Sequence, residues 1–196
     1  MKKPSYWWQI FGFLFASAGG TLLHFVYEWS GESVLTAPIS GINESTWEHM
    51  KLLFVPMALY AVIQSFFVKD ASYWCAKALS SLSGLLAIPV LYYTLNGAFG
   101  KTSARVNIAL FFVSAAVAYL LEYYLLKRGI PKCKKGWGIL FFILVAVAFA
   151  VFTFMPPEIP LFRDPVTGGY GIGYFFVQKN DFLVFCSYGI HICVQR

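Results

Sequence analysis

Charged residues are scarce in this chain. Only 12% of its 196 residues are Asp, Glu, Lys or Arg, whereas 59% are hydrophobic and the mean hydropathy is +0.65. A soluble domain carries about 25% charged residues, so this composition excludes a water-soluble globule and a disordered chain. It also excludes a nucleic-acid-binding module, whose Lys and Arg would line one groove. The composition predicts a protein whose partner is a lipid bilayer, with no nucleic acid.

The apolar residues gather in five long runs. A helix needs about 20 apolar residues to cross a hydrocarbon core of ~30 Å. Helices are expected because lipid offers no partner for backbone N–H and C=O groups. The predicted spans are 5–27, 47–68, 74–97, 104–126 and 136–156. The sequence therefore predicts an all-α integral membrane protein with about five transmembrane helices in one polytopic domain, residues 1–174.

The two ends of the chain depart from this pattern. Lys2, Lys3 and the apolar run that follows imitate a cleavable signal peptide, but the run continues through Val26, which favours a packed first helix. Residues 158–181 contain several Pro and Gly residues and predict an irregular loop. The tail, residues 175–196, is of uncertain structure, and its apolar stretch 182–195 predicts an interfacial or re-entrant segment because it is too short to span a bilayer.

The positive charges predict the orientation. With the N-terminus inside, nine Lys and Arg residues face the cytoplasm and five face the other side. Lys and Arg in short loops are retained on the cytoplasmic side, so we expect a cytoplasmic N-terminus. Cys75 and Cys133 then fall at cytoplasmic helix ends, where thiols stay reduced. The four cysteines show no C-x-x-C spacing, so neither a zinc knuckle nor a disulfide framework is predicted.

A polar cluster is predicted at the non-cytoplasmic face. His24 and Glu28 are four residues apart and share one face of the first helix. The second helix starts with a dense polar run that includes Asn43, Glu44, Glu48, His49 and Lys51. A loop of 18 residues can bring the two helix ends together. Polar groups near membrane depth are costly and tend to be paired or functional, so this cluster is the candidate ligand-binding site.

Two interpretations of the cluster stay open. His24, Glu28, Glu48 and His49 are ligand types that hold a divalent metal such as zinc, and a bound ion would polarise a water or a carbonyl. The structural alternative is a capping box, in which the Ser45 hydroxyl caps the helix and Glu48 reaches back to the cap N–H. The metal interpretation would make the protein a metal-dependent membrane hydrolase.

Glu122 is a carboxylate inside the fourth predicted helix. One interpretation is that it extends to Lys127 or Arg128 near the cytoplasmic end. The other is a proton or cation relay.

The run from Asn43 to Lys51, N-E-S-T-W-E-H-M-K, and the run from Pro157 to Gly171, P-E-I-P-L-F-R-D-P-V-T-G-G-Y-G, resemble an uncharacterised family of small bacterial multi-pass membrane proteins. The resemblance covers the chain to about Ile172 and adds Arg163 and Asp164 to the candidate ligand-binding residues. It implies a membrane fold and residence in the bacterial inner membrane, and it does not indicate which activity the protein has. We expect a protein that binds or transports a small solute or ion, with the hydrolase as the alternative.

Overall fold

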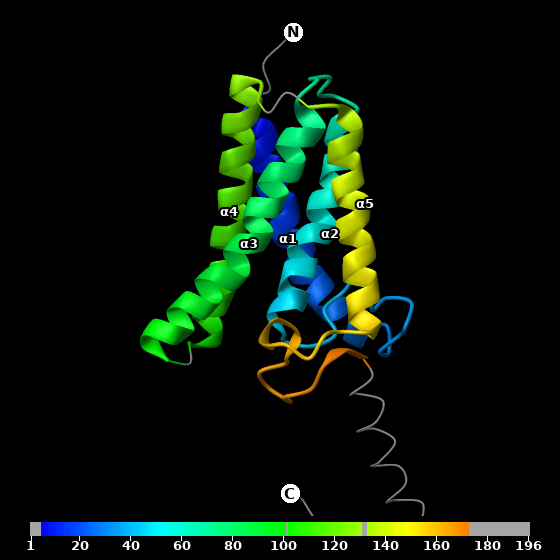
Figure 1. The fold of residues 1–196 in the computed structure, drawn as a ribbon, viewed down its shortest axis with the longest axis vertical. Helices are drawn as coiled ribbons and strands as arrows, with labels where there is room; N and C mark the ends of the chain where they lie inside the picture. The colour runs from blue at the N-terminus through cyan, green and yellow to red at the C-terminus, as the bar shows by residue number, and fades with distance from the viewer. Residues whose placement is uncertain (1–4, 101, 131–132, 173–196) are drawn as a thin grey trace, which may run out of the picture.

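The computed structural model describes residues 5–100, 102–130 and 133–172. Over these residues the chain forms α1 (Trp7–Trp29), α2 (Thr46–Ser65), α3 (Tyr73–Phe99), α4 (Ala104–Arg128), α5 (Lys135–Phe154) and the short 3-10 helix η1 (Pro160–Phe162). The α-helices run alternately up and down in an elongated bundle (Figure 1). Each begins and ends within three residues of a predicted span. The predicted all-helical membrane fold is confirmed, whereas the predicted tail at 175–196 lies outside the described residues.

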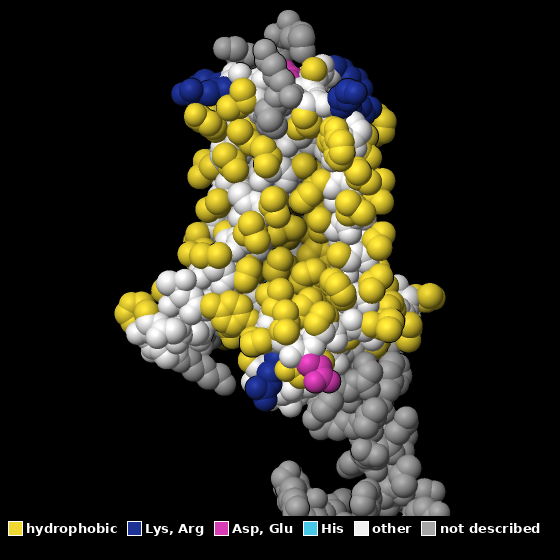
Figure 2. Space-filling view, in the orientation of Figure 1, with side chains coloured by type: hydrophobic (Ala, Val, Ile, Leu, Met, Phe, Trp, Pro, Cys, Tyr) yellow, Lys and Arg dark blue, Asp and Glu magenta, His cyan; other side chains and the backbone are white. Residues whose placement is uncertain are grey.

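Four of the helices, α1, α3, α4 and α5, are long and apolar enough to cross a bilayer. Their outward side chains form a hydrophobic surface over the middle of the molecule, and Lys and Arg gather at its ends (Figure 2). This distribution fits a lipid bilayer environment.

Helix α2 differs from the other four because it is buried at the centre of the bundle. More than half of its 20 residues are buried, and it contacts every other α-helix. A helix surrounded by protein can carry polar residues, because those residues do not face lipid. That α2 also crosses the bilayer stays a prediction.

Small residues let the helices approach closely. A Cβ atom at Gly20 of α1 would lie 2.5 Å from the Phe111 ring and 2.8 Å from the Leu52 carbonyl oxygen. A Cβ at Gly84 of α3 would lie 2.8 Å from the Ala118 Cβ on α4. Close backbone approach is the main source of helix association in lipid, so these glycines set the spacing of α1, α3 and α4 in the bundle.

The two ends of the bundle are chemically distinct. At one end, which we call the disulfide end, Cys75 at the start of α3 is bonded to Cys133, just before α5. The expectation that these thiols are reduced is therefore wrong for this structure. No local pattern predicts this bond, because the two cysteines are 58 residues apart and meet only through the packing of α3 on α5.

The opposite end, the cluster end, carries the α1–α2 connection and the loop 155–172. The loop is irregular, as expected: apart from η1, it contains a single β-bridge between Arg163 and Tyr170. Helix η1 packs on α2. At this end α3 and α4 lean away from the other helices (Figure 1).

Candidate functional site

Three predicted site residues meet at the cluster end. Glu44, in the loop before α2, lies between two histidines: its Oε1 is 3.3 Å from Nε2 of His24 on α1, and its Oε2 is 3.7 Å from Nε2 of His49 on α2. The centroids of the two imidazole rings are 5.8 Å apart. We call His24, Glu44 and His49 the His–Glu–His cluster. All three side chains are partly exposed, so a ligand can reach them.

Local hydrogen bonds hold this cluster at the start of α2. The Ser45 hydroxyl accepts from the Glu48 N–H at 3.3 Å and caps the helix. The Ser45 N–H donates to Asn43 Oδ1 at 2.9 Å, which shapes the turn that carries Glu44. His49 Nδ1 lies 2.9 Å from the Ser45 carbonyl oxygen and donates to it, so the ring turns its Nε2 toward Glu44. The predicted Ser45 cap is present, but Glu48 does not complete a capping box.

Glu48 and Lys51 form a buried ion pair instead. Lys51 Nζ lies 2.6 Å from Glu48 Oε2, and the two side chains are 0% and 3% exposed. The ammonium also donates to the Ala37 carbonyl oxygen at 2.8 Å and to Thr153 Oγ1 on α5 at 2.9 Å. Glu48 Oε2 accepts from the Ile42 N–H at 3.1 Å. The pair therefore fastens the α1–α2 connection to α2 and α5, and neither side chain reaches the His–Glu–His cluster.

The charge state of Glu44 follows from its two neighbours. A hydrogen bond from His24 is the largest cause that lowers the pKa of the Glu44 carboxyl below its ordinary value. Partial burial acts in the opposite direction, and the charges of His49 and His24 lower the pKa further. Glu44 is therefore ionised at neutral pH, and it accepts a hydrogen bond from His24, whereas His49 Nε2, at 3.7 Å, is too far for one.

A cleft of about 640 Å³ opens beside the cluster, between α1 and α2 on one side and the leaning ends of α3 and α4 on the other. Its walls are mainly apolar, and its polar groups include the His–Glu–His cluster and amide and hydroxyl side chains near the α3–α4 connection. Ile108 on α4 lines the cleft and is 58% exposed, so the cleft is open along α4. The apolar walls include Leu52, Ile88, Ile108, Phe111 and Phe112, and the polar groups near the connection are Asn96, Thr102 and Asn107.

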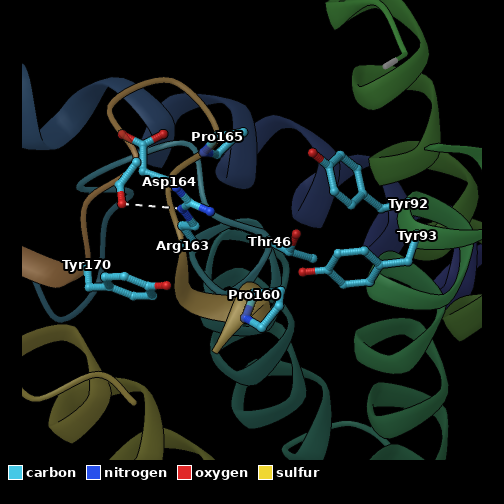
Figure 3. Close-up of a pocket in the computed structure, with 9 residues that line it drawn as sticks. Thr46, Tyr92, Tyr93, Pro160, Arg163, Asp164, Pro165 and Tyr170 are labelled. Carbon is cyan, nitrogen blue, oxygen red and sulfur yellow. Dashed lines mark hydrogen bonds between the residues drawn. The ribbon is translucent and has the colours of Figure 1, made fainter. Parts of the chain in front are cut away.

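A second pocket, of about 460 Å³, adjoins the cleft. The two share Thr46, Tyr92 and Pro165 in their walls, so they lie side by side. The loop after η1 supplies Arg163 and Asp164, the two site residues predicted from the resemblance. Figure 3 shows both residues on the loop side of the pocket, across from Tyr92 and Tyr93 of α3.

The predicted metal ligands do not come together. Glu28 is exposed at the end of α1, and Glu48 is held by Lys51. In the part of the chain that the structure describes, no group of three or more His, Cys, Asp and Glu side chains is placed to hold a metal ion. Two histidines and one carboxylate converge, but the carboxylate already bridges the imidazoles. The side chains do not fit the zinc site that the hydrolase interpretation requires.

A second buried ion pair, which was not predicted from the sequence, lies at the disulfide end. Lys77 Nζ on α3 lies 2.7 Å from Glu122 Oε2 on α4, and both side chains are buried. Gln9 on α1 donates to Glu122 Oε1 at 3.3 Å, and the ammonium lies 5.1 Å and 5.3 Å from the ring centroids of Tyr60 and Tyr119. The interpretation that Glu122 extends to Lys127 or Arg128 is wrong. A signal was available, because Lys77 is a cation placed inside an otherwise apolar helix.

Comparison with known proteins gives a family and no function. Residues 1–172 match the model of DUF6512, described as a family of unknown function. No curated protein and no solved structure matches the chain.

Proposed function

The chain belongs to DUF6512, a family of unknown function, and we propose that this membrane protein binds an amphipathic small molecule in the cleft at the cluster end. The observation that carries the proposal is the composition of the cleft. The cleft has a volume of about 640 Å³ and mainly apolar walls, and the His–Glu–His cluster forms part of its lining. Binding sites for small molecules have volumes of about 300–1,000 Å³, mostly apolar linings and a few convergent polar groups.

The arrangement favours a ligand with two chemically different parts. The apolar part would lie against Ile88, Ile108 and Phe111, where burial is worth roughly 25 cal/mol per Å² of apolar surface. The polar part would lie against the polar groups that line the cleft and the adjoining second pocket. A cleft open along α4 would admit such a ligand sideways from the bilayer, without passage through water. Uptake of this kind supports a binding or transport component rather than a channel for a hydrated ion.

The positions of the predicted metal ligands do not support a metal-dependent hydrolase. It needs a fixed metal ion with an open coordination position, and the four predicted ligands are not assembled around one point. We further propose the bacterial inner membrane as the location, with the disulfide end cytoplasmic, on the strength of the charge distribution and the resemblance of the motifs.

The experiment is a binding measurement on the full chain in phosphatidylcholine nanodiscs. Dansyl-undecanoic acid and its uncharged methyl ester are titrated, and empty nanodiscs supply the blank. We expect a saturable fluorescence increase with the wild type. Ile108→Trp should remove most of it, because the indole would fill the cleft, whereas Ile143→Trp should not.

Ile143 is a matched control because it is the same residue type, is 54% exposed, and lies on α5 away from the cleft. Equal saturable binding by the two Trp variants would refute the proposed function. So would the absence of any saturable binding by the wild type.

A further inference from the structure

The second pocket offers hydrogen-bond donors that other groups in the described residues do not use. The Arg163 side chain makes one hydrogen bond, from Nε to the Gly168 carbonyl oxygen at 3.4 Å, and it has no ion-pair partner in the described part of the chain. The hydroxyls of Tyr93 and Tyr170 point toward one another from opposite sides of the pocket, with Arg163 and Pro160 between them (Figure 3). Neither hydroxyl bonds to another described residue. Tyr92 adds a third hydroxyl at the boundary with the cleft.

The nearby carboxylates are already occupied. Asp164 lines the same pocket, but its Oδ1 accepts from the Val166 N–H at 2.9 Å and its Oδ2 accepts from the Thr167 hydroxyl at 2.6 Å. Its oxygens therefore serve the turn of its own loop. Glu44 lines only the cleft and lies between His24 and His49. The pocket consequently presents a guanidinium and phenol donors without a free carboxylate among them.

We propose that this pocket binds the anionic group of the ligand whose apolar part occupies the cleft. The proposal deepens the proposed function and rests on it. Arg is the side chain best suited to a phosphate or carboxylate, because its planar donors can form two parallel charge-assisted bonds. Thr46, Tyr92 and Pro165 border both spaces, so one molecule can lie in the cleft and place its anion beside Arg163. The ligand class is an anionic amphiphile with a phosphate or carboxylate at the end of an apolar chain.

The test compares the two dansyl probes in nanodiscs on the wild type and on two Arg variants. Arg163→Gln should weaken binding of the acid roughly tenfold or more, the effect of losing a charge-assisted hydrogen bond, and should leave binding of the uncharged ester unchanged. Arg105→Gln is the matched control, because Arg105 is exposed near the start of α4 and lines neither the pocket nor the cleft. It should bind both probes as the wild type does.

A second variant covers the case in which Arg163→Gln does not fold. Tyr93→Phe removes one hydroxyl and keeps the ring, so we expect a loss of a few-fold for the acid and none for the ester. Equal binding of the acid by the wild type and both variants would overturn the anion proposal while leaving the proposed function intact. Equal weakening of acid and ester would overturn it as well, since the side chains would then serve packing. Failure of the proposed function has a separate signature, because the ester would not bind the wild type saturably.

A displacement arm identifies the source of the anion. Inorganic phosphate and dodecyl phosphate are each added to the wild type loaded with the acid. Displacement by inorganic phosphate supports the site and assigns it to a free anion. Displacement by dodecyl phosphate alone supports the site and assigns it to an anion carried on a lipid chain, which is the result we expect. Displacement by neither would overturn the proposal.

Discussion

Replacing Lys51 by Met should destabilise this protein far more than the same change at a surface lysine. Met keeps most of the length of the lysine side chain and removes its charge. The change deletes three contacts of the ammonium, to Glu48 at 2.6 Å, to the Ala37 carbonyl oxygen at 2.8 Å and to Thr153 Oγ1 at 2.9 Å. It also leaves the Glu48 carboxylate buried without its cation.

The magnitude follows from the burial of both partners. Removing one member of a buried ion pair costs about 3–5 kcal/mol, most of it the penalty of the charge that remains. In a protein of this length, 1 kcal/mol shifts the melting temperature by roughly 2–4 °C. We therefore expect Lys51→Met to lower the melting temperature by about 10 °C, measured by thermal unfolding of the detergent-purified chain.

Lys69→Met is the matched control, because Lys69 is exposed and donates only to the Ser65 carbonyl oxygen at 3.0 Å. It should melt close to the wild type. Adding Glu48→Gln to Lys51→Met should recover part of the loss, since the remaining partner is then neutral. If Lys51→Met and Lys69→Met melt within about 2 °C of each other, the buried pair does not hold the loop as described.

Three further outcomes are expected. Glu122→Gln should lower the melting temperature in detergent, because it leaves Lys77 buried without an anion; an unchanged melt would contradict the pairing. The lowered pKa of Glu44 makes the cluster a source of stability that is present above the ordinary carboxyl pKa and is lost as the pH falls through the lowered value. Glu44→Gln should therefore flatten the acid side of a plot of melting temperature against pH, and an unchanged curve would exclude this contribution. Reporter fusions near Ser33 and near Cys133 should report opposite sides of the membrane, with Cys133 in the cytoplasm. If both fusions report the same side, the five-span topology is wrong.

The helices were predictable because lipid imposes a simple requirement on sequence. Each span must be about 20 residues long and nearly free of charge, and the observed helix ends lie within three residues of the predicted ones. The central, buried position of α2 was harder to predict from the sequence. Its polar residues made it resemble the start of a functional site, whereas its central position in the bundle lets it carry a buried ion pair.

The candidate site was only partly predictable. The convergence of His24, Glu44 and His49 follows from two helix ends joined by one connection, and the structure brings them together. The roles of Glu48 and Lys51 depend on a loop carbonyl and on a threonine 102 residues away, which no local pattern encodes. Glu28 shares a helix with His24 but stays exposed.

The orientation and the disulfide give opposite indications. The charge distribution places the disulfide end in the cytoplasm, whereas disulfides persist mainly in oxidising compartments. If the predicted orientation holds, the thiols of Cys75 and Cys133 should be reduced in growing cells and paired after oxidation. Alkylation before lysis, followed by mass spectrometry, would detect the free thiols. A bridge already formed in growing cells would argue for the reverse orientation.

The most direct test of the account is to map where an amphiphile binds. A fatty acid that carries a photoactivatable diazirine on its chain is added to the full protein in nanodiscs and irradiated, and the modified residues are located by mass spectrometry. We expect saturable labelling of cleft residues such as Leu52, Ile108 and Phe111, and we expect Ile108→Trp to reduce it. Labelling spread evenly over lipid-facing residues such as Ile143, with no saturable component in the cleft, would contradict it.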